Sequence, residues 1–317
     1  MSMMVRHVGC MTNILCGSKM VGETENLLMI HEIQAKVLLA HVRQPEPWFG
    51  LKYNMNIYRG CQHQCIYCDS RSECYQIENF KDVLVKVNAV ELLSKELPRK
   101  RVKGTIGTGS MSDPYLPLEA QRNLTGQALQ VIAAHHFPVH IITKSDLVLR
   151  DLETLRQISQ VYAAVTFTIT TADDSLARKI EPGAPLPSDR LRVIRELAAN
   201  GILTGVTMMP ILPFIEDTQE NITQIVRLAK ENGATYIIPS FGMTLRDRQR
   251  AYYYDQLDRH FPGMRTEYER RFGNQYFAPA RDLPELEAHF RSLCQDLNIC
   301  TAIPQFSPLK NQQLRFL

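Results

Sequence analysis

Short apolar, β-branched runs alternate with longer amphipathic segments through most of the chain. The short runs predict strands at 53–58, 104–108, 138–143, 161–170, 202–209 and 235–239. The amphipathic segments predict helices at 88–97, 118–135, 148–159, 188–200 and 217–232. Strands that alternate with helices in this rhythm favour a parallel sheet, because consecutive parallel strands need a crossover connection. The pattern therefore predicts an α/β fold, either doubly wound or curled into a barrel.

The ends of the predicted helices carry the expected stop signals. Gly201 and Gly233 directly follow two of them, and Pro98 follows the first. Residues 1–50 lie outside the alternating pattern and predict an N-terminal extension. After residue 240 the chain becomes helical, aromatic and rich in arginine. We therefore expect an α/β core at 51–240, with a C-terminal extension at 241–317 that packs on it.

Composition narrows the class of protein without naming a function. Apolar residues make up 44% of the 317 residues and charged residues 22%, which is typical of a globular protein. A net charge of +3 is too small to indicate a nucleic-acid-binding protein by itself. The chain has no apolar run long enough for a membrane span and no clear signal peptide, so we expect a cytoplasmic protein with reduced cysteines.

Three of the eight cysteines, Cys61, Cys65 and Cys68, lie within eight residues. They follow the first predicted strand, so they belong at the C-terminal edge of the sheet, where α/β proteins place their active sites. The CxxxCxxC spacing suits three thiolates around one face of an iron–sulfur cluster, with one iron left open. A structural zinc site is the alternative, and His63 or Cys74 would then supply the fourth ligand.

Four motifs in order resemble one family. They are GCQHQCIYC at 60–68, GTGSMSDPYLPLE at 107–119, ITKSDLVLRD at 142–151 and TFTITTADDSLARKIEPGAPLPSDRL at 166–191. The three-cysteine motif with an aromatic residue before its last cysteine resembles the radical S-adenosylmethionine (SAM) superfamily. All four together are similar to its spore photoproduct lyase-like branch, over residue 50 to at least residue 260.

The resemblance implies a partial (β/α)6 barrel of the radical SAM type, with N-terminal and helical C-terminal extensions. It also implies two cofactors, a 4Fe–4S cluster and SAM, and an electron donor such as flavodoxin or ferredoxin. In this superfamily the reduced cluster cleaves SAM, and the resulting 5′-deoxyadenosyl radical abstracts a hydrogen atom from the substrate. The cofactors supply this chemistry, and the protein supplies position, electronics and exclusion of water.

The resemblance assigns roles to individual residues. Cys61, Cys65 and Cys68 are the expected iron ligands. The expected SAM contacts are Tyr67, Ser112, Lys144, Thr168, Glu181 and Arg190. Each of the latter has an ordinary alternative: Tyr67 as a core tyrosine, Lys144 as a solvated lysine at a strand end, and the others as structural or surface pairs. A backbone contact to adenine is also expected at 208–213, which is equally consistent with an apolar core run.

Two positions depart from the lyase pattern. Spore photoproduct lyases carry a hydrogen-donating cysteine just before the serine matched by Ser112, and here that residue is Met111. They also carry a tyrosine directly after the third cluster cysteine, where this chain has Asp69. A thioether has no S–H bond to donate. We therefore expect no repair of spore photoproduct by the cysteine-dependent route, and the sequence identifies no catalytic residue of its own.

Nucleic acid stays open as a substrate, whether DNA or RNA. The segment 246–271 interleaves arginines with tyrosines, and 98–104 adds a second basic cluster. Such side chains contact phosphates and stack on bases. However, five acidic residues dilute the charge of 246–271, which favours a solvated helix whose tyrosines face the core.

Three functions remain after the sequence alone. The leading one is a lyase-like radical SAM enzyme on an unidentified substrate, with nucleic acid as a candidate. The second is a radical SAM enzyme that modifies a peptide or a small metabolite. The third is a zinc-stabilised nucleic-acid-binding module, for which metal content is the discriminating observation. The other cysteines, including Cys10, Cys16, Cys294 and Cys300, are too scattered to predict a second cluster.

Overall fold

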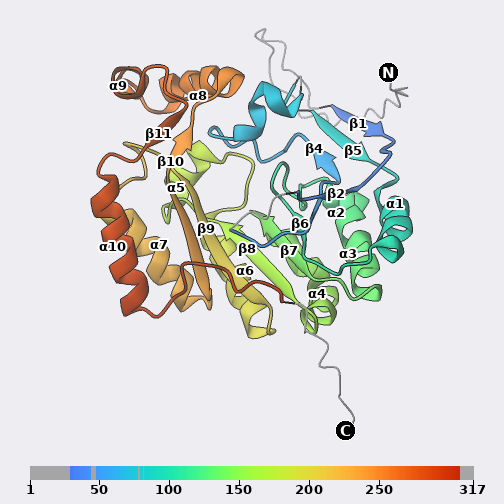
Figure 1. Ribbon diagram of the computed structural model, residues 1–317. Helices are drawn as coiled ribbons and strands as arrows, with labels where there is room; N and C mark the ends of the chain where they lie inside the picture. The colour runs from blue at the N-terminus through green and yellow to red at the C-terminus, as the bar shows by residue number, and fades with distance from the viewer. Residues whose placement is uncertain (1–28, 44–47, 78, 81, 308–317) are drawn as a thin grey trace, which may run out of the picture.

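An eight-stranded sheet organises the computed structural model, which describes residues 29–43, 48–77, 79–80 and 82–307 (Figure 1). The strand order is β11-β10-β9-β8-β7-β6-β3-β2. The strands are β2 Leu39–His41, β3 Tyr53–Met55, β6 Ile106–Thr108, β7 Val139–Thr143, β8 Ala163–Thr168, β9 Leu203–Ile211, β10 Tyr236–Thr244 and β11 Phe277–Pro279. The six central strands, β3 and β6 to β10, pair in parallel, and β2 and β11 add antiparallel edges. The fold is a partial (β/α)6 barrel, as expected.

Helices connect the parallel strands. They are α1 Ala89–Glu96, α2 Glu119–Arg122, α3 Leu124–Ala134, α4 Leu152–Ser159, α5 Asp174–Ile180, α6 Pro187–Ala199 and α7 Gln219–Glu231. Of these, α4 packs against β8 and α6 against β9. Gly201 and Gly233 adopt positive φ angles of 74° and 88° where α6 and α7 end, as the sequence predicts. Among the described residues, no helix is long and apolar enough to cross a membrane.

The C-terminal part of the chain is helical and covers one side of the sheet. It contains α8 Asp247–His260, α9 Met264–Phe272 and α10 Leu283–Asp296. In Figure 1, α8 and α9 lie above the end of β10, whereas α10 runs along its outside next to α7. Phe290 of α10 contacts Phe241 of β10 edge to face, with ring centroids 5.8 Å apart. These contacts place α8 beside the loops at the C-terminal edge of the sheet.

The predicted strand at 53–58 is in fact two strands in two sheets. Tyr53–Met55 forms β3 in the main sheet, whereas Tyr58–Arg59 forms β4 in a small sheet of order β1-β5-β4. The other members of this sheet are β1 Ile30–Ile33 and β5 Val83–Lys86. Nothing in the local sequence separates β3 from β4. They are two strands because each pairs with a strand of a different sheet.

Two predicted helices have different boundaries in the structure, and one further helix was not predicted. The helix expected at 118–135 is split into α2 and α3 by Asn123, whose φ angle of 51° ends the first helix. The helix expected at 148–159 begins earlier, as the 3₁₀ turn η4 Asp146–Asp151, and continues as α4. The helix α5 was not predicted. Its start is capped by Asp173, whose carboxylate accepts hydrogen bonds from the backbone N–H groups of Ser175 and Leu176.

Candidate functional site

The cysteine loop begins directly after β4 and lies against the segment that follows α5. The backbone N–H of Ile66 donates to the carbonyl of Ile180 at 2.9 Å, and that of Gly183 donates to the carbonyl of His63 at 3.0 Å. Gly60 begins the loop with a φ angle of 80°, and a Cβ there would lie 1.9 Å from the carbonyl oxygen of Asp82. A side chain at this position would displace the loop, so Gly60 is required for its path.

All three thiols of the loop lie in a low-dielectric environment. Cys61 and Cys65 are buried and Cys68 is partly buried. Burial raises the pKa of all three thiols, to about 12 for Cys65, and the neighbouring cysteines raise the pKa of Cys61 further. The positive charges of Lys144 and Arg71 oppose this effect at Cys68. In the metal-free chain the three groups are therefore thiols, and a metal must displace their protons to bind.

The donor chemistry of this loop fits an iron–sulfur cluster. Three cysteines that act on one another electrostatically provide the ligands that such clusters prefer. The metal-free side chains are not preassembled, because no group of three His, Cys, Asp or Glu side chains within the described ranges has metal-binding geometry. The two residues proposed as a fourth zinc ligand already have other partners: Nδ1 of buried His63 is 3.4 Å from Asp113, and the thiol of exposed Cys74 accepts a hydrogen bond from Arg246.

Glu181 is the centre of a buried polar cluster beside the cysteine loop. Its carboxylate accepts a hydrogen bond from the Tyr67 hydroxyl and pairs with Nη2 of Arg190 at 2.5 Å. Nζ of Lys144 lies 3.8 Å from the same carboxylate and 5.6 Å from the centre of the Tyr67 ring. Burial alone would raise the pKa of Glu181, but Arg190 and Lys144 outweigh it and lower the pKa. The carboxylate is therefore ionised at neutral pH.

Four of the six residues expected to contact SAM thus meet at one place: Tyr67, Lys144, Glu181 and Arg190. The fifth, Thr168, is joined to them through its backbone, since its carbonyl accepts a hydrogen bond from Nη1 of Arg190 at 2.8 Å. The sixth, Ser112, is buried and donates its hydroxyl to the carbonyl of Gly60 at 2.5 Å. All six lie around the C-terminal edge of the parallel strands. Lys144 directly follows β7 and is not turned out to solvent, because its side chain is 16% exposed.

Asp113 organises the site, and the sequence analysis did not single it out. Its carboxylate accepts hydrogen bonds from the Thr143 hydroxyl and the Lys144 backbone N–H, both at 2.7 Å. It also accepts one from the Tyr115 backbone N–H at 2.8 Å. These bonds hold the ends of β6 and β7 together and fix the backbone of Lys144. The only sequence signal was its place inside the second motif.

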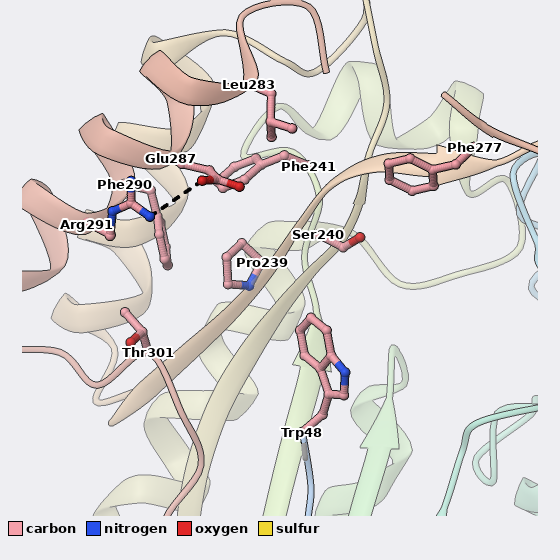
Figure 2. Close-up of a pocket in the computed structure, with 10 residues that line it drawn as sticks. All are labelled: Trp48, Pro239, Ser240, Phe241, Phe277, Leu283, Glu287, Phe290, Arg291 and Thr301. Carbon is pink, nitrogen blue, oxygen red and sulfur yellow. Dashed lines mark hydrogen bonds and ion pairs between the residues drawn. The ribbon is translucent and has the colours of Figure 1, made fainter. Parts of the chain in front are cut away.

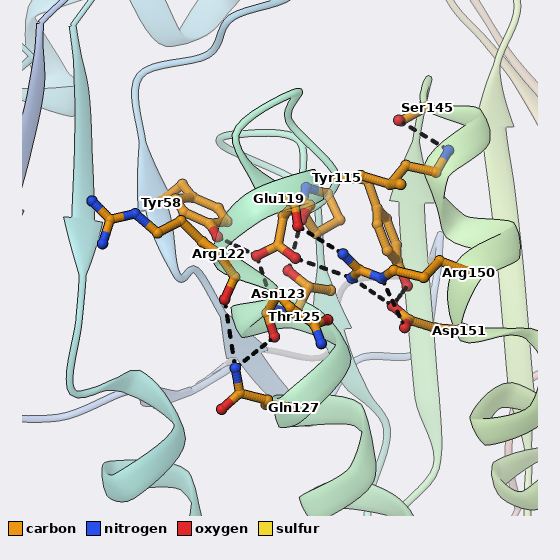
Figure 3. Close-up of polar contacts among 12 residues, drawn as sticks. Tyr58, Tyr115, Glu119, Arg122, Asn123, Thr125, Gln127, Ser145, Arg150 and Asp151 are labelled. Carbon is orange, nitrogen blue, oxygen red and sulfur yellow. Dashed lines mark hydrogen bonds and ion pairs between the residues drawn. The ribbon is translucent and has the colours of Figure 1, made fainter. Parts of the chain in front are cut away.

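The rest of the second motif is structural (Figure 3). Glu119 is fully buried and accepts hydrogen bonds from the Tyr58 hydroxyl and from the Thr125 backbone N–H. Arg150 bridges Glu119 and Asp151 at 3.1 and 2.9 Å. The Tyr115 hydroxyl donates to Asp151 at 3.0 Å, which completes the network. The network ties β4, α2 and η4 together behind the cysteine loop, so these residues position the site without lining it.

The two departures from the lyase pattern have different surroundings. Met111 is partly buried in the loop after β6. Asp69, directly after Cys68, accepts a hydrogen bond from Thr244 at 2.6 Å and pairs with Nε of Arg246 at 3.0 Å. Thr244 ends β10 and Arg246 precedes α8. In this chain Asp69 therefore fastens the cysteine loop to the C-terminal helices.

The remaining cysteines do not gather at the site. Cys74 is exposed, and Cys10 and Cys16 lie outside the described residues. Cys294 is buried in α10. Cys300 pairs through its backbone with Tyr236 at the start of β10, which is the opposite end of the sheet from the cysteine loop. Apart from Cys61, Cys65 and Cys68, the described residues include three cysteines, and of these only Cys74 belongs to the same region as the candidate site.

A cavity of about 380 Å³ opens beside β10 at the edge of the sheet (Figure 2). It is lined by Trp48, Pro239, Ser240, Phe241, Phe277, Leu283, Glu287, Phe290, Arg291 and Thr301. Trp48 and Phe277 are 44% and 40% exposed. Two half-exposed rings and a few polar groups around an apolar floor suit a ligand with a flat ring.

The arginine- and tyrosine-rich segment 246–271 is partly internally paired. Tyr253, Tyr254 and Tyr268 are buried in one hydrophobic cluster. Arg265 pairs with Asp258 and Glu269, each at 2.9 Å. Arg270 pairs with Glu267 at 2.6 Å, as Arg246 does with Asp69. This arrangement agrees with the second interpretation of the segment, helices whose tyrosines face the core.

Comparison with known proteins identifies the family. Residues 55–229 match the model of the radical SAM superfamily. An uncharacterised protein of Mycobacterium tuberculosis is 30% identical over 261 residues, which cover 80% of this chain and 76% of that protein. This chain belongs to the radical SAM superfamily.

Two further matches extend the comparison. The fold resembles that of spore photoproduct lyase complexed with dinucleoside spore photoproduct, with a TM-score of 0.62 and 16% identity over 84% of this chain and 79% of the lyase. A radical SAM Nα-GlyT isomerase of Pseudomonas phage M6 is 24% identical over 57% of this chain and 37% of its own length. The expected likeness to the lyase-like branch is confirmed at the level of the fold, and family membership supports an enzyme.

Proposed function

We propose that this protein is a radical SAM enzyme whose cluster ligands are Cys61, Cys65 and Cys68. The observation that supports it most is the meeting of the cysteine loop with the Tyr67–Glu181–Arg190–Lys144 cluster at the C-terminal edge of the sheet. When bound, the two cofactors supply reductive cleavage of SAM and hydrogen-atom abstraction from a substrate. The protein's own residues hold the cluster, orient SAM and exclude water.

The polar cluster suits a zwitterionic ligand such as the methionyl part of SAM. Lys144 and Arg190 provide positive charge and Glu181 provides negative charge, all at buried positions. Charged hydrogen-bonding groups are strongest when water is excluded around them. Ser112 keeps acceptor capacity on its hydroxyl oxygen after it donates to Gly60. We assign these residues to SAM binding on this basis.

A nucleic-acid component is the substrate that we favour. The lyase with a similar fold was solved with dinucleoside spore photoproduct, and the phage relative is named a radical SAM Nα-GlyT isomerase. In this chain, Trp48 and Phe277 offer two half-exposed rings on the walls of the cavity at the sheet edge. Rings of this kind stack on bases irrespective of sequence. Arg246, Arg265 and Arg270 of this segment are already paired with carboxylates, which favours a base or nucleoside in a short strand over a long duplex.

Metal content and SAM cleavage test the proposal together. The protein is purified or reconstituted under anaerobic conditions, and iron, sulfide and zinc are measured. We expect about four irons per chain, and formation of 5′-deoxyadenosine from SAM when dithionite, flavodoxin or ferredoxin supplies electrons. Changing Cys61, Cys65 or Cys68 to Ala removes both. A colourless zinc protein without SAM cleavage would refute the proposal and favour a zinc-stabilised binding module.

Substrate class needs a separate measurement. Binding of a fluorescent single-stranded oligonucleotide is compared between the wild type and Trp48→Ala at several salt concentrations. We expect weaker binding by the variant, and a shallow salt dependence because stacking on bases should contribute more than contacts with phosphates. Equal binding by both proteins would mean that the cavity does not support a nucleic-acid substrate. A peptide or a small metabolite would then be the favoured substrate class.

A further inference from the structure

Arg71 is a buried cation next to the cysteine loop. It is the last residue of the 3₁₀ turn η1 Asp69–Arg71, which directly follows Cys68. The residue is 8% exposed. Its guanidinium carbon lies over two aromatic rings, 4.3 Å from the centre of Phe80 and 3.6 Å from the centre of Tyr252 in α8. These two contacts restrict the orientation of the guanidinium.

The polar contacts of Arg71 lead back to the cysteine loop. Nη2 donates to Oε1 of Gln64 at 2.9 Å, and Nε2 of Gln64 donates to the carbonyl of Cys61 at 2.5 Å. The backbone N–H of Arg71 donates to the carbonyl of Cys68 at 3.3 Å. Nε of Arg71 is buried and has no hydrogen-bond partner among the described residues. A buried donor without a partner is uncommon and points to a group that binds later.

The charge of Arg71 also lacks a partner within the described part of the chain. No carboxylate there forms an ion pair with it, and the groups that act on its charge are Tyr252 and the thiols of Cys68, Cys65 and Cys61. Arg246, on the other side of η1, differs because Asp69 balances its charge at 3.0 Å. A buried charge is costly unless an opposite charge compensates it. The three cysteines are the place where that opposite charge would form.

We propose that Arg71 is a positioning residue that balances the negative charge of the iron–sulfur cluster and raises its reduction potential. This inference rests on the proposed function. Three cysteines bind iron as thiolates, and reduction of the cluster by one electron from the donor adds one more negative charge. A fixed buried cation nearby stabilises the reduced state more than the oxidised state. The stacking on Tyr252 makes the C-terminal helix α8 part of this control.

The test measures the midpoint potential of the reconstituted cluster by dye-mediated titration, followed by electron paramagnetic resonance. The variants are Arg71→Gln and Arg71→Lys. We expect Arg71→Gln to lower the ratio of reduced to oxidised cluster at a fixed potential about tenfold, which is about 59 mV for one electron. Arg71→Lys keeps the charge and is expected to stay within threefold of the wild type. Equal potentials in Arg71→Gln and the wild type, at equal iron content, would overturn the proposal.

Two control variants isolate the charge. Arg246→Gln removes a solvent-accessible arginine that already has a counter-ion, so we expect less than a threefold change. Glu78→Gln removes a carboxylate that lies near Phe80 in the sequence and outside the described residues, and we expect no change. If Glu78→Gln instead raises the potential as much as Arg71→Gln lowers it, Glu78 is the counter-ion and the proposal is wrong.

Loss of the cluster from a variant is also informative. Loss from Arg71→Gln with retention in Arg71→Lys would support the role of the charge, whereas loss from both would show that the arginine acts through packing and would overturn the proposal.

Unfolding of the metal-free proteins gives an independent measurement. Because the charge is uncompensated without the cluster, metal-free Arg71→Gln is expected to be as stable as the wild type. A wild type that assembles no cluster would refute the proposed function and not this role alone.

Discussion

The hydroxyl of Tyr67 donates a hydrogen bond to Glu181, although 114 positions separate the two residues in the sequence. Tyr67 belongs to the cysteine loop, and Glu181 directly follows α5. The backbone of the same two segments pairs through Ile66 and Ile180. One contact therefore couples the loop that carries Cys61, Cys65 and Cys68 to the segment that carries Glu181 and Arg190. A phenylalanine at position 67 could fill the same space but could not donate this hydrogen bond.

Glu181→Gln is predicted to destabilise the protein strongly. The variant leaves Arg190 buried without its counter-charge, which costs about 3–5 kcal/mol of unfolding free energy. The matched control is Glu153→Gln, which breaks an exposed pair with Arg156 and is expected to cost less than about 1 kcal/mol. Denaturant unfolding at pH 7 measures both. A loss no larger for Glu181→Gln than for the control would contradict the role of the buried pair.

At acidic pH the difference in unfolding free energy between the wild type and Glu181→Gln should become smaller. The folded pKa of Glu181 lies below its ordinary value of 4.5, so its contribution is fully present above that pH and is lost as pH falls through the folded pKa. The wild type is therefore expected to lose more stability than Glu181→Gln between pH 5 and pH 3. Parallel losses in the two proteins would show that Glu181 is not ionised in the folded state.

Glu216→Gln is predicted to stabilise the protein at alkaline pH. Burial raises the pKa of Glu216 from 4.5 to about 8. Between those pH values the unfolded chain loses the proton that the folded chain keeps, so stability falls as pH rises. At pH 8 the variant should exceed the wild type by up to about 4 kcal/mol.

The glutamine side chain of Glu216→Gln would keep the acceptor for the Leu212 backbone N–H, which Oε2 of Glu216 accepts at 2.9 Å. For this reason the two proteins are expected to be nearly equally stable at pH 5. Urea unfolding at pH 5, 6.5 and 8 measures the trend. A difference that does not grow with pH would argue against a neutral Glu216 in the folded protein.

Lys144→Met is predicted to weaken SAM binding at least tenfold, about 1.4 kcal/mol, without loss of iron. The change removes the cation that faces Glu181 at the expected SAM site. Lys179→Met is the control, since Lys179 also lies over an aromatic ring, that of Phe261 at 5.8 Å, but is exposed. Calorimetric titration of the reconstituted proteins with SAM compares them. Unchanged affinity in Lys144→Met would remove this lysine from the site.

Spore photoproduct repair is predicted to be inefficient in the wild type. The lyase-like reaction must return a hydrogen atom to a product radical, and its rate depends on a weak bond to hydrogen held close by. Met111 offers only C–H bonds at the lyase's cysteine position. With a dinucleotide photoproduct under anaerobic conditions, mass spectrometry should detect 5′-deoxyadenosine but little thymine.

Met111→Cys should raise the thymine yield by restoring a thiol at that position. Efficient, multiple-turnover repair by the wild type would show that another donor exists. Cys74 would then be the first residue to change, since it is the placed cysteine nearest in sequence to the cluster ligands and is exposed.

Local sequence predicted the α/β class of this protein, whereas the choice of a partial barrel over a doubly wound sheet came from the family resemblance. The alternation of strands and helices depends on apolar periodicity within short segments, so β6 to β10 and their crossover helices were predictable. The cysteine loop was predictable as well, because its ligands are close together in the sequence. Family motifs then indicated Tyr67, Lys144, Glu181 and Arg190, although neither motif nor periodicity indicated that they form one cluster.

Long-range pairing decided what the local pattern left open. The apolar run at 53–58 is compatible with one strand, and only its different partners, β6 and β5, make it two. Asp113 is an ordinary acidic residue in the sequence, and it becomes an anchor because β6 and β7 end side by side. Arg71 looks like a surface arginine until Phe80 and Tyr252 pack against it. Motif spacing pointed to the cysteine loop and to the residues expected around it, whereas burial and the choice of partners, which depend on segments far apart in the chain, decided what each of them faces.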